Sequence, residues 1–501
     1  MNIANWIKQR AYLEPQDTIL KDGPLTLSNE EFYQRVLGEV SYLRSRGVRS
    51  GDRVAVMLYN SSLFLELFFA CAHVGAILVP LNYRLAGAEL KYLIEDSGSS
   101  FLILDEVFRE KAEPVGQDSE FKVFVNQDNR NTLYSPLGSF ESSGGVMPEE
   151  SVSMDTPLLI MYTSGTTGRP KGATLSHGNI LWNSIMHLRE GFFKEKCLAN
   201  APFFHVAGLN ISALQTLYCR GSLVIEKSFN PSSTLELIEK ERITCMFAAP
   251  TMMDMLARDP LFETVDFSSV RYIIAGSAPV PVMLIERFHE RGVKIRQAYG
   301  LTEASPAGCI LHDEHALAKQ GSCGKEMFHL EIRMVDENGK DVQVGDVGEV
   351  IIKGPNVMLG YWKNPEATRE TIRDGWLWTG DMGKKDEDGF IYIVDRKKDL
   401  IISGGENISP AEVESVLIEH ADVAQVAVIG VPDEKWGEVP IAFVVTEPGK
   451  TPSSEEFIKF CQPRIAKYKI PAAFQFASEL PRNAMGKVNK SLLKERFDTQ
   501  K

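Results

Sequence analysis

Residues 162–172 read YTSGTTGRPKG, and this stretch combines residue types that can hold an anion. Its glycines let the backbone come close to a ligand, because they lack a side chain and accept positive φ angles. Exposed N–H groups, hydroxyl groups and one ammonium group can then cradle phosphate oxygens. The residues of this cradle are Thr163, Ser164, Gly165, Thr166, Thr167, Gly168 and Lys171. The spacing differs from the Walker A pattern, so the composition predicts phosphate binding without naming the phosphate compound.

The elements that would position this stretch follow an α/β pattern. The apolar residues directly before it predict a strand. Residues 53–58 and 76–80 predict two further buried strands, and Asn60 or Ser61 would cap an apolar helix between them. Such a βαβ unit implies that its strands pair in parallel. The same alternation recurs over residues 221–300, which predicts ligand-bearing loops at the ends of the strands.

The pattern changes after about residue 320. Residues 330–336 and 347–353 alternate apolar and polar side chains, which predicts strands of an antiparallel or mixed sheet. The charged run DRKKD at 395–399 marks a boundary, and beyond it the pattern predicts a small α+β domain. Its helices are expected at 409–420, capped by Ser409, and at 454–466. We therefore expect an N-terminal domain at 1–395, whose β-rich part covers about 320–395, and a C-terminal domain at 396–501.

The composition excludes several classes of partner. The net charge of −13 argues against nucleic acid, whose phosphates need clustered basic residues. The seven cysteines are scattered without a C-x-x-C pair, which predicts reduced thiols in a cytoplasmic protein. The apolar stretch 63–81 is interrupted by Glu66, His73 and Pro80. We therefore expect a buried helix followed by a strand there, and no integral membrane segment.

Eight motifs, in order along the chain, resemble those of the adenylate-forming enzymes. This family comprises acyl-CoA and aryl-CoA synthetases, peptide-synthetase adenylation domains and beetle luciferases. The stretch SGTTGRPKG at 164–172 is the most specific motif. The others are APFFHVAG (201–208), AGSAPV (275–280), QAYGLTEAS (297–305), GEVIIKGPNVMLGYW (348–362), WLWTGDMG (376–383), DRKKDLIISGGENISPAEVE (395–414) and LPRNAMGK (480–487). The resemblance implies a large N-terminal α/β domain with stacked parallel and mixed sheets and a distorted β-barrel-like subdomain, then a small, mobile α+β C-terminal domain.

The family reaction has two halves. A carboxylate attacks the α-phosphate of ATP to give acyl-AMP and pyrophosphate, and the thiol of CoA then displaces AMP. The first half brings an anion to a polyanion, so it requires cations and oriented dipoles rather than a side-chain nucleophile. The resemblance thus implies an acid–thiol ligase that uses ATP, Mg²⁺ and coenzyme A and acts on a small-molecule carboxylic acid.

The resemblance also assigns nucleotide contacts. Residues 163–171 would hold the β- and γ-phosphates during adenylation. Thr302 would contact the α-phosphate, and Glu303 would bind Mg²⁺, for which a carboxylate beside phosphate oxygens is a suitable donor set. The residues that would surround the adenine and the ribose are Gly276, Ser277, Ala278, Tyr299, Gly300, Asp381 and Arg396.

Further roles fall on the C-terminal domain and on one histidine. Lys487 would bridge the acyl carboxylate and the phosphate as a point cation. Lys398 occupies the hinge position about which the small domain rotates between the half-reactions. The rotation would withdraw Lys487 and bring Gly404 and Gly405 beside the pantetheine arm, where no side chain fits. His205 occupies the position of the gate between the acyl pocket and the thiol channel.

The sequence specifies the acyl substrate less closely than the nucleotide. The segments expected to line its pocket, 205–209, 250–253 and 304–307, contain no Lys or Arg, which favours an uncharged tail. The main expectation is a medium- or long-chain fatty acid, and the alternative is an aryl acid of the o-succinylbenzoate or cinnamate type. A stand-alone adenylation enzyme that loads a carrier protein, or a nucleotide-binding protein without turnover, would also fit the motifs. The sequence leaves a homodimer and a peripheral membrane contact open.

Overall fold

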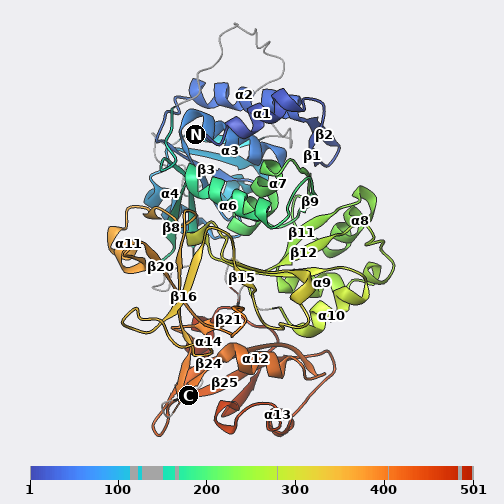
Figure 1. Cartoon of the computed structure of the whole chain (residues 1–501), viewed down its shortest axis with the longest axis vertical. Coiled ribbons are helices and arrows are strands. Elements are labelled where there is room, and N and C mark those ends of the chain that lie inside the picture. Colours follow the sequence, from blue (N-terminus) through green and yellow to red (C-terminus); the bar gives the residue numbers. More distant parts are fainter. Residues whose placement is uncertain are drawn as a thin grey trace. The chain divides into compact units, whose positions relative to one another are not determined.

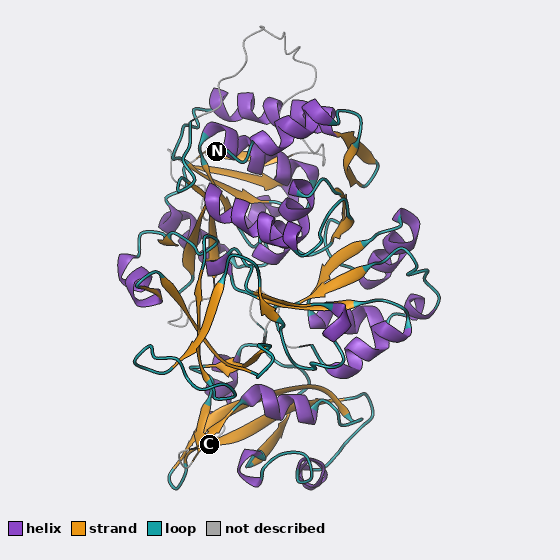
Figure 2. Ribbon diagram, viewed as in Figure 1, coloured by secondary structure: helices purple, strands orange, loops and turns teal. Residues whose placement is uncertain are grey.

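The computed structural model describes residues 2–112, 122–126, 151–163, 169–278, 280–403, 406–482 and 488–498. The chain divides into two compact units (Figures 1 and 2). Unit 1 comprises Met1–Ile332 with Ile352–Trp378, and unit 2 comprises Arg333–Ile351 with Thr379–Lys501. The domain boundary at residues 395–396 stays a prediction.

Unit 1 contains a nine-stranded mixed sheet, counted over the described residues. Its six strands from β13 to β1 run parallel, and the outer strands β2, β14 and β15 are antiparallel to their neighbours. The parallel core confirms the βα alternation predicted over residues 221–300. The spatial order is β15 (Lys325–Glu326), β14 (Cys309–Leu311), β13 (Ile295–Tyr299), β12 (Tyr272–Ala275), β11 (Cys245–Ala248), β9 (Lys196–Ala199), β10 (Ser222–Ile225), β1 (Thr18–Asp22) and β2 (Leu25–Ser28).

A second sheet of unit 1 carries the predicted phosphate-binding stretch. Strands β7, β4, β3, β5 and β6 run parallel, and the β3–β4 pair confirms the predicted βαβ unit. Strand β8 returns antiparallel to β7, and β18 is antiparallel to β8. The order in this part of the described chain is β18 (Gly360–Tyr361), β8 (Lys171–Ser176), β7 (Pro157–Thr163), β4 (Ile77–Pro80), β3 (Arg53–Met57), β5 (Phe101–Asp105) and β6 (Lys122–Asn126).

Local signals in the sequence set the helices of unit 1. Helix α3 (Ser62–Val74) begins after Ser61, whose hydroxyl accepts a hydrogen bond from the Phe64 N–H, and ends at Gly75 in the left-handed region. Every residue of α3 is buried, as the sequence predicted. The other helices are α1 (Asn5–Leu13), α2 (Asn29–Ser45), α4 (Gly87–Ser97), α5 (Arg109–Ala112), α6 (His177–Arg189), α7 (Gln215–Tyr218), α8 (Pro231–Glu241), α9 (Pro250–Arg258), α10 (Val282–Glu290) and α11 (Pro365–Thr371).

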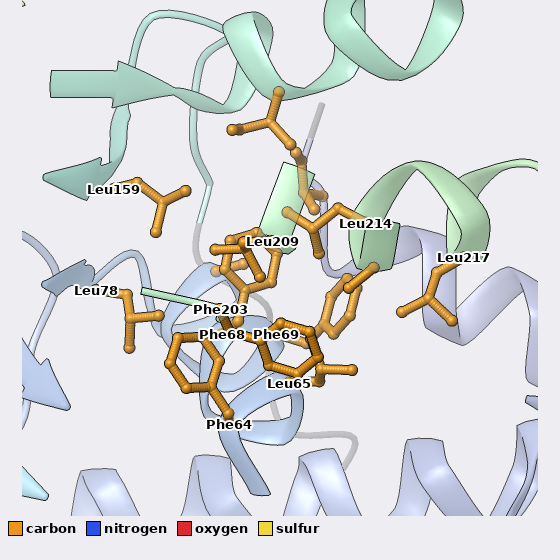
Figure 3. Close-up of a cluster of buried hydrophobic side chains, with 14 of the residues drawn as sticks. Phe64, Leu65, Phe68, Phe69, Leu78, Leu159, Phe203, Leu209, Leu214 and Leu217 are labelled. Atoms are coloured by element: carbon orange, nitrogen blue, oxygen red, sulfur yellow. The ribbon is translucent and has the colours of Figure 1, made fainter. Parts of the chain in front are cut away.

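A cluster of aromatic and aliphatic side chains forms the main core of unit 1 (Figure 3). Phe64, Phe68 and Phe69 of α3 are at most 1% exposed. Phe64 packs edge-on against Phe203, with ring centroids 5.4 Å apart. Phe203 lies two residues before His205, so this core supports the backbone that carries the predicted gate residue. No helix of the described chain is long and apolar enough to cross a membrane.

A third sheet contains residues assigned to both units. Its order is β16 (Glu331–Val335), β17 (Gly348–Lys353), β20 (Trp376–Lys385) and β19 (Ile372–Arg373), and β21 (Ile391–Arg396) also pairs with β20. Strands β16 and β17 are the two that alternation predicted after residue 320. The short strands and the antiparallel β19–β20–β21 pairings give a β-rich part distinct from the parallel sheets.

The rest of unit 2 is the predicted α+β domain. Its strands are β22 (Ile401–Ser403), β23 (Glu406–Ile408), β24 (Val423–Asp433), β25 (Gly437–Thr446) and β26 (Ala473–Phe476), and its helices are α12 (Pro410–Leu417), α13 (Ser454–Cys461) and α14 (Lys490–Asp498). Helix α12 begins after Ser409, whose hydroxyl accepts from the Glu412 N–H, as predicted. Helix α13 is shorter than the predicted 454–466, because Pro463 cannot donate the next helical hydrogen bond.

Candidate active site

The phosphate-binding stretch joins two neighbouring antiparallel strands. Thr163 at the end of β7 is paired with Lys171 at the start of β8, so the motif closes a hairpin rather than a strand–helix turn. Ser164, Gly165, Thr166, Thr167 and Gly168 lie outside the described residues, and their phosphate contacts stay predictions. Gly172 has a packing role, because a Cβ there would lie 2.7 Å from Cγ2 of Ile160.

The structure brings Thr163 and Glu303 together across 140 residues of chain. Glu303 lies in a short 3₁₀ turn, Thr302–Ala304, that follows strand β13, and its side chain is buried. Its Oε1 accepts hydrogen bonds from Thr163 Oγ1 at 3.3 Å and from Tyr361 OH at 2.9 Å. The Lys171 ammonium lies 5.1 Å from the centre of the Tyr361 ring. A carboxylate with hydroxyl neighbours is a hard oxygen donor set, which fits Mg²⁺.

Tyr361 is a site residue to which the motifs alone assigned no role. It lies in the GYW end of a quoted motif, and β18 places it beside β8. Because its hydroxyl contacts Glu303 and its ring contacts Lys171, it touches both the predicted metal ligand and the predicted phosphate ligand. Only the pairing of β18 with β8 reveals this contact, since Tyr361 is 58 residues from Glu303 in the sequence.

The segment before Tyr361 also fixes the turn that carries Glu303. The amide of Asn356 donates to the carbonyl oxygens of Ala304 and Ala307 at 2.5 and 2.8 Å. Ser305 Oγ donates back to the Asn356 carbonyl at 2.7 Å, and the Met358 N–H donates to the Glu303 carbonyl at 2.8 Å. Four hydrogen bonds therefore hold the chain at Glu303 and over the four residues that follow it.

The predicted nucleotide residues of unit 1 lie at neighbouring strand ends. Gly276 follows β12 and Tyr299 ends β13, and these strands are parallel partners. A Cβ on Gly276 would lie 2.8 Å from the Ala298 carbonyl, and a Cβ on Gly300 would lie 1.5 Å from the Pro306 carbonyl, so neither position has room for a side chain. Ser277 and Ala278 are exposed next to them. Their contacts with adenine stay predictions.

His205 precedes a buried π-helical segment, Ala207–Leu214, whose wide turns are frequent at functional sites. The His205 side chain is half-buried, and its Nδ1 accepts from the Ala207 N–H at 3.2 Å. Asn210 of the same segment donates through Nδ2 to the Ser305 carbonyl at 3.0 Å. The structure thus places Asn210, which directly follows the predicted pocket segment 205–209, against the predicted pocket segment 304–307.

The predicted ribose-binding pair lies in unit 2. Asp381 of β20 and Arg396 of β21 are direct cross-strand partners, and the Arg396 Nε lies 2.6 Å from the Asp381 Oδ1. The Asp381 side chain is only 6% exposed, and a carboxylate buried to this extent needs a counter-charge. The Arg396 guanidinium supplies it. Lys398 is exposed in the turn after β21. Gly404, Gly405 and Lys487 lie outside the described residues, and their roles stay predictions.

The chain matches known proteins along its whole length. Residues 7–362 match the AMP-binding enzyme family and residues 412–487 match the AMP-binding enzyme C-terminal domain. A feruloyl-CoA synthase of an Amycolatopsis species is 41% identical over 99% of each chain. An indoleacetate–CoA ligase of Aromatoleum aromaticum is 40% identical over 98% of this chain and 97% of its own.

A solved structure extends the comparison to the fold. The o-succinylbenzoate-CoA synthetase of Bacillus subtilis, solved with its acyl-adenylate intermediate, superposes with a TM-score of 0.87 at 34% identity, covering 98% of each chain. The same protein has also been solved with ATP and a magnesium ion. These matches confirm the predicted fold class. The chain therefore belongs to the AMP-binding enzyme family, as an acid–CoA ligase of the AMP-forming class that uses ATP, Mg²⁺ and coenzyme A.

Proposed function

We propose that this ligase activates an aryl carboxylic acid with a single carboxylate, of the arylpropenoic or arylacetic type. The observation that carries this proposal is the similarity to a feruloyl-CoA synthase and an indoleacetate–CoA ligase, at 41% and 40% identity over 99% and 98% of this chain. It favours the aryl alternative over the fatty acid that was the main expectation from the sequence.

The residues of the expected acyl pocket support a substrate with one charge. The segments 206–209 and 304–307 are buried and uncharged, and Asn210 connects them. A second carboxylate, as in o-succinylbenzoate, would need a cation beside it. None of the described residues in the three lining segments is a Lys or Arg, so the second carboxylate would stay uncompensated there.

The proposed mechanism relies on positioning and charge compensation. Lys171 and residues 164–168 would hold the terminal phosphates, and Glu303 would hold Mg²⁺, which would supply positive charge against the triphosphate. Asp381 and Arg396 bind the ribose, and Lys487 draws the acyl carboxylate to the α-phosphate. Rotation about Lys398 then exchanges Lys487 for the 403–409 segment, and CoA enters past His205.

A panel of acids tests the substrate class. Ferulate, cinnamate, indoleacetate, octanoate, palmitate and o-succinylbenzoate are each supplied with ATP, Mg²⁺ and CoA, and AMP release and product mass are measured. We expect kcat/KM for the best aryl monoacid to exceed that for octanoate by about tenfold or more, the scale of a few pocket contacts. A higher value for a fatty acid would contradict the aryl assignment, and acyl-AMP without acyl-CoA would indicate carrier loading.

Removing the Tyr361 hydroxyl tests the metal site. Tyr361→Phe deletes one hydrogen bond to the Glu303 carboxylate, so we expect the Mg²⁺ concentration for half-maximal adenylation to rise about tenfold, the scale of one hydrogen bond to a charged group. Titration of Mg²⁺ in the adenylation assay measures this shift. Tyr392→Phe is the control, because it deletes a Tyr–Asp386 hydrogen bond in unit 2. An unchanged Mg²⁺ requirement in Tyr361→Phe would contradict the role of Glu303 or its support by Tyr361.

A further inference from the structure

We propose that the Glu349–Lys397 ion pair positions the two ribose-binding residues, Asp381 and Arg396. This inference rests on the proposed function, which assigns the ribose to that pair. Glu349 lies near the start of β17, and Lys397 directly follows the last residue of β21. Neither residue is part of the site described above.

A single carboxylate contacts strand β20 and the residue that directly follows strand β21. Glu349 Oε2 lies 2.8 Å from the Lys397 ammonium, and Oε1 accepts from the Gly380 N–H at 3.3 Å. The Lys397 N–H in turn donates to the Gly380 carbonyl at 2.9 Å. Gly380 precedes Asp381 and Lys397 follows Arg396, so each contact lies one residue from a ribose-binding side chain.

Strand β17 also contacts residues 379–381 through a second residue, Val350. The Thr379 hydroxyl donates to the Val350 carbonyl at 2.7 Å and accepts from the Asp381 N–H at 3.1 Å. Gly380 itself has φ +71°, a backbone conformation that glycine adopts readily and other residues rarely adopt. Glu349 and Val350 therefore fix the backbone at residues 379–381, and Glu349 also ties it to the strand that carries Arg396.

The two side chains of this ion pair differ in exposure, and the difference favours a local role over a contribution to global stability. Lys397 is half exposed, so the ion pair contributes little to the global free energy of unfolding. The Glu349 side chain is only 9% exposed, and a carboxylate so placed must keep a partner. Without the lysine charge, the carboxylate would have to turn toward water or toward Arg396. Either change releases the Gly380 N–H and shifts the Asp381 carboxylate.

Lys397 is adjacent to the proposed hinge, so its anchoring also affects where the rotation can begin. Lys398, the hinge residue of the proposed mechanism, comes next. An anchored Lys397 ends the rigid strand pair at residue 397, so the ribose contacts persist while the chain beyond it changes direction.

The test uses a readout specific to the ribose. Adenylation is followed as acid-dependent exchange of pyrophosphate into the nucleotide, with ATP and with 2′-deoxy-ATP, for the full-length wild type, Lys397→Gln, Glu349→Gln, their double variant and Lys397→Arg. We expect both single glutamine variants to raise KM for ATP about tenfold, the scale of a hydrogen bond to a charged group, with kcat within about twofold. Their preference for ATP over 2′-deoxy-ATP should fall by the same factor.

Two further variants identify the cause. The double variant should lose no more than either single variant, because the two residues act as one pair, and Lys397→Arg should keep most of the preference. Lys384→Gln is the matched control, since this exposed lysine of β20 lies against the Tyr392 ring and should leave the preference unchanged. Thermal unfolding of each variant should show wild-type stability. If Glu349→Gln fails to fold, Lys397→Gln and Lys397→Arg carry the test.

Asp381→Asn separates the failure of this inference from the failure of the proposed function. If Asp381→Asn abolishes the preference for ATP while Lys397→Gln and Glu349→Gln keep it, the positioning role is wrong and the ribose assignment stands. If Asp381→Asn itself keeps the preference, the ribose assignment is wrong and the inference falls with it. A loss of kcat with an unchanged preference in Lys397→Gln would also overturn the positioning role.

Discussion

Lys487→Ala should reduce the rate of adenylation by about 10²–10⁴-fold, the scale of losing one preorganised electrostatic contact. The acyl carboxylate and the triphosphate are both anions, and a lysine between them removes their repulsion in the transition state. Lys487 lies outside the described residues, so this role follows from its motif, LPRNAMGK. Acid-dependent pyrophosphate exchange into ATP measures the loss directly.

A comparison of adenylation with thioester formation shows whether Lys487 acts in only the first half-reaction. Thioester formation from supplied acyl-AMP and CoA should change far less in Lys487→Ala, because the proposed rotation has already withdrawn this lysine. Lys494→Ala, an exposed lysine on α14, is the matched control and should leave both steps unchanged. An equal loss in the two half-reactions of Lys487→Ala would contradict the two-conformation mechanism.

Glu303→Gln should have the second-largest effect, a loss of about 10²–10³-fold in adenylation. The amide has nearly the same shape and can still accept the Tyr361 hydrogen bond, so the turn held by Asn356 should stay in place. The negative charge is lost, however, and with it the preferred ligand for Mg²⁺. The rate of AMP release across a range of Mg²⁺ concentrations measures the effect.

The stability of this variant decides how the loss is interpreted. We expect thermal unfolding of Glu303→Gln to match the wild type, because only a charge has been removed from a hydrogen-bonded position. Glu331→Gln, which changes an exposed glutamate on β16, is the control and should keep full activity. If Glu303→Gln retained wild-type Mg²⁺ dependence, the metal would have to be held by other residues.

Local elements were predictable wherever a short-range signal decided them. Ser409 caps its helix as expected, and Ser61 is the cap of the two that the sequence left open, because a cap needs only the residue itself and the next three backbone N–H groups. The buried α3 and β4 were predictable because Glu66, His73 and Pro80 interrupt the apolar run, which a membrane span tolerates poorly. Helix α13 was predicted too long, since the apolar pattern outweighed Pro463.

The candidate site was predictable only in its chemical types. The sequence showed a phosphate-binding stretch through its composition, and the resemblance of its motifs added the roles of Glu303 and Lys487. The resemblance assigned Asp381 and Arg396, from two separate motifs, to the ribose, and the β20–β21 register shows that they lie side by side. It did not show Asn356 holding the Glu303 turn or Glu349 joining the strands beside Asp381.

The sequence by itself determined the α/β alternation, the family and the reaction class, because periodicity, caps and motif composition act over a few residues. Only the tertiary structure decided that β8 returns beside β7 and that β18 brings Tyr361 to Glu303 and Lys171. The contacts of Tyr361 join residues 58 positions apart, to Glu303, and 190 positions apart, to Lys171, and they depend on which strand edges pair. Strand pairing is a competition among many similar edges, and it is resolved by packing of the whole core rather than by any local signal.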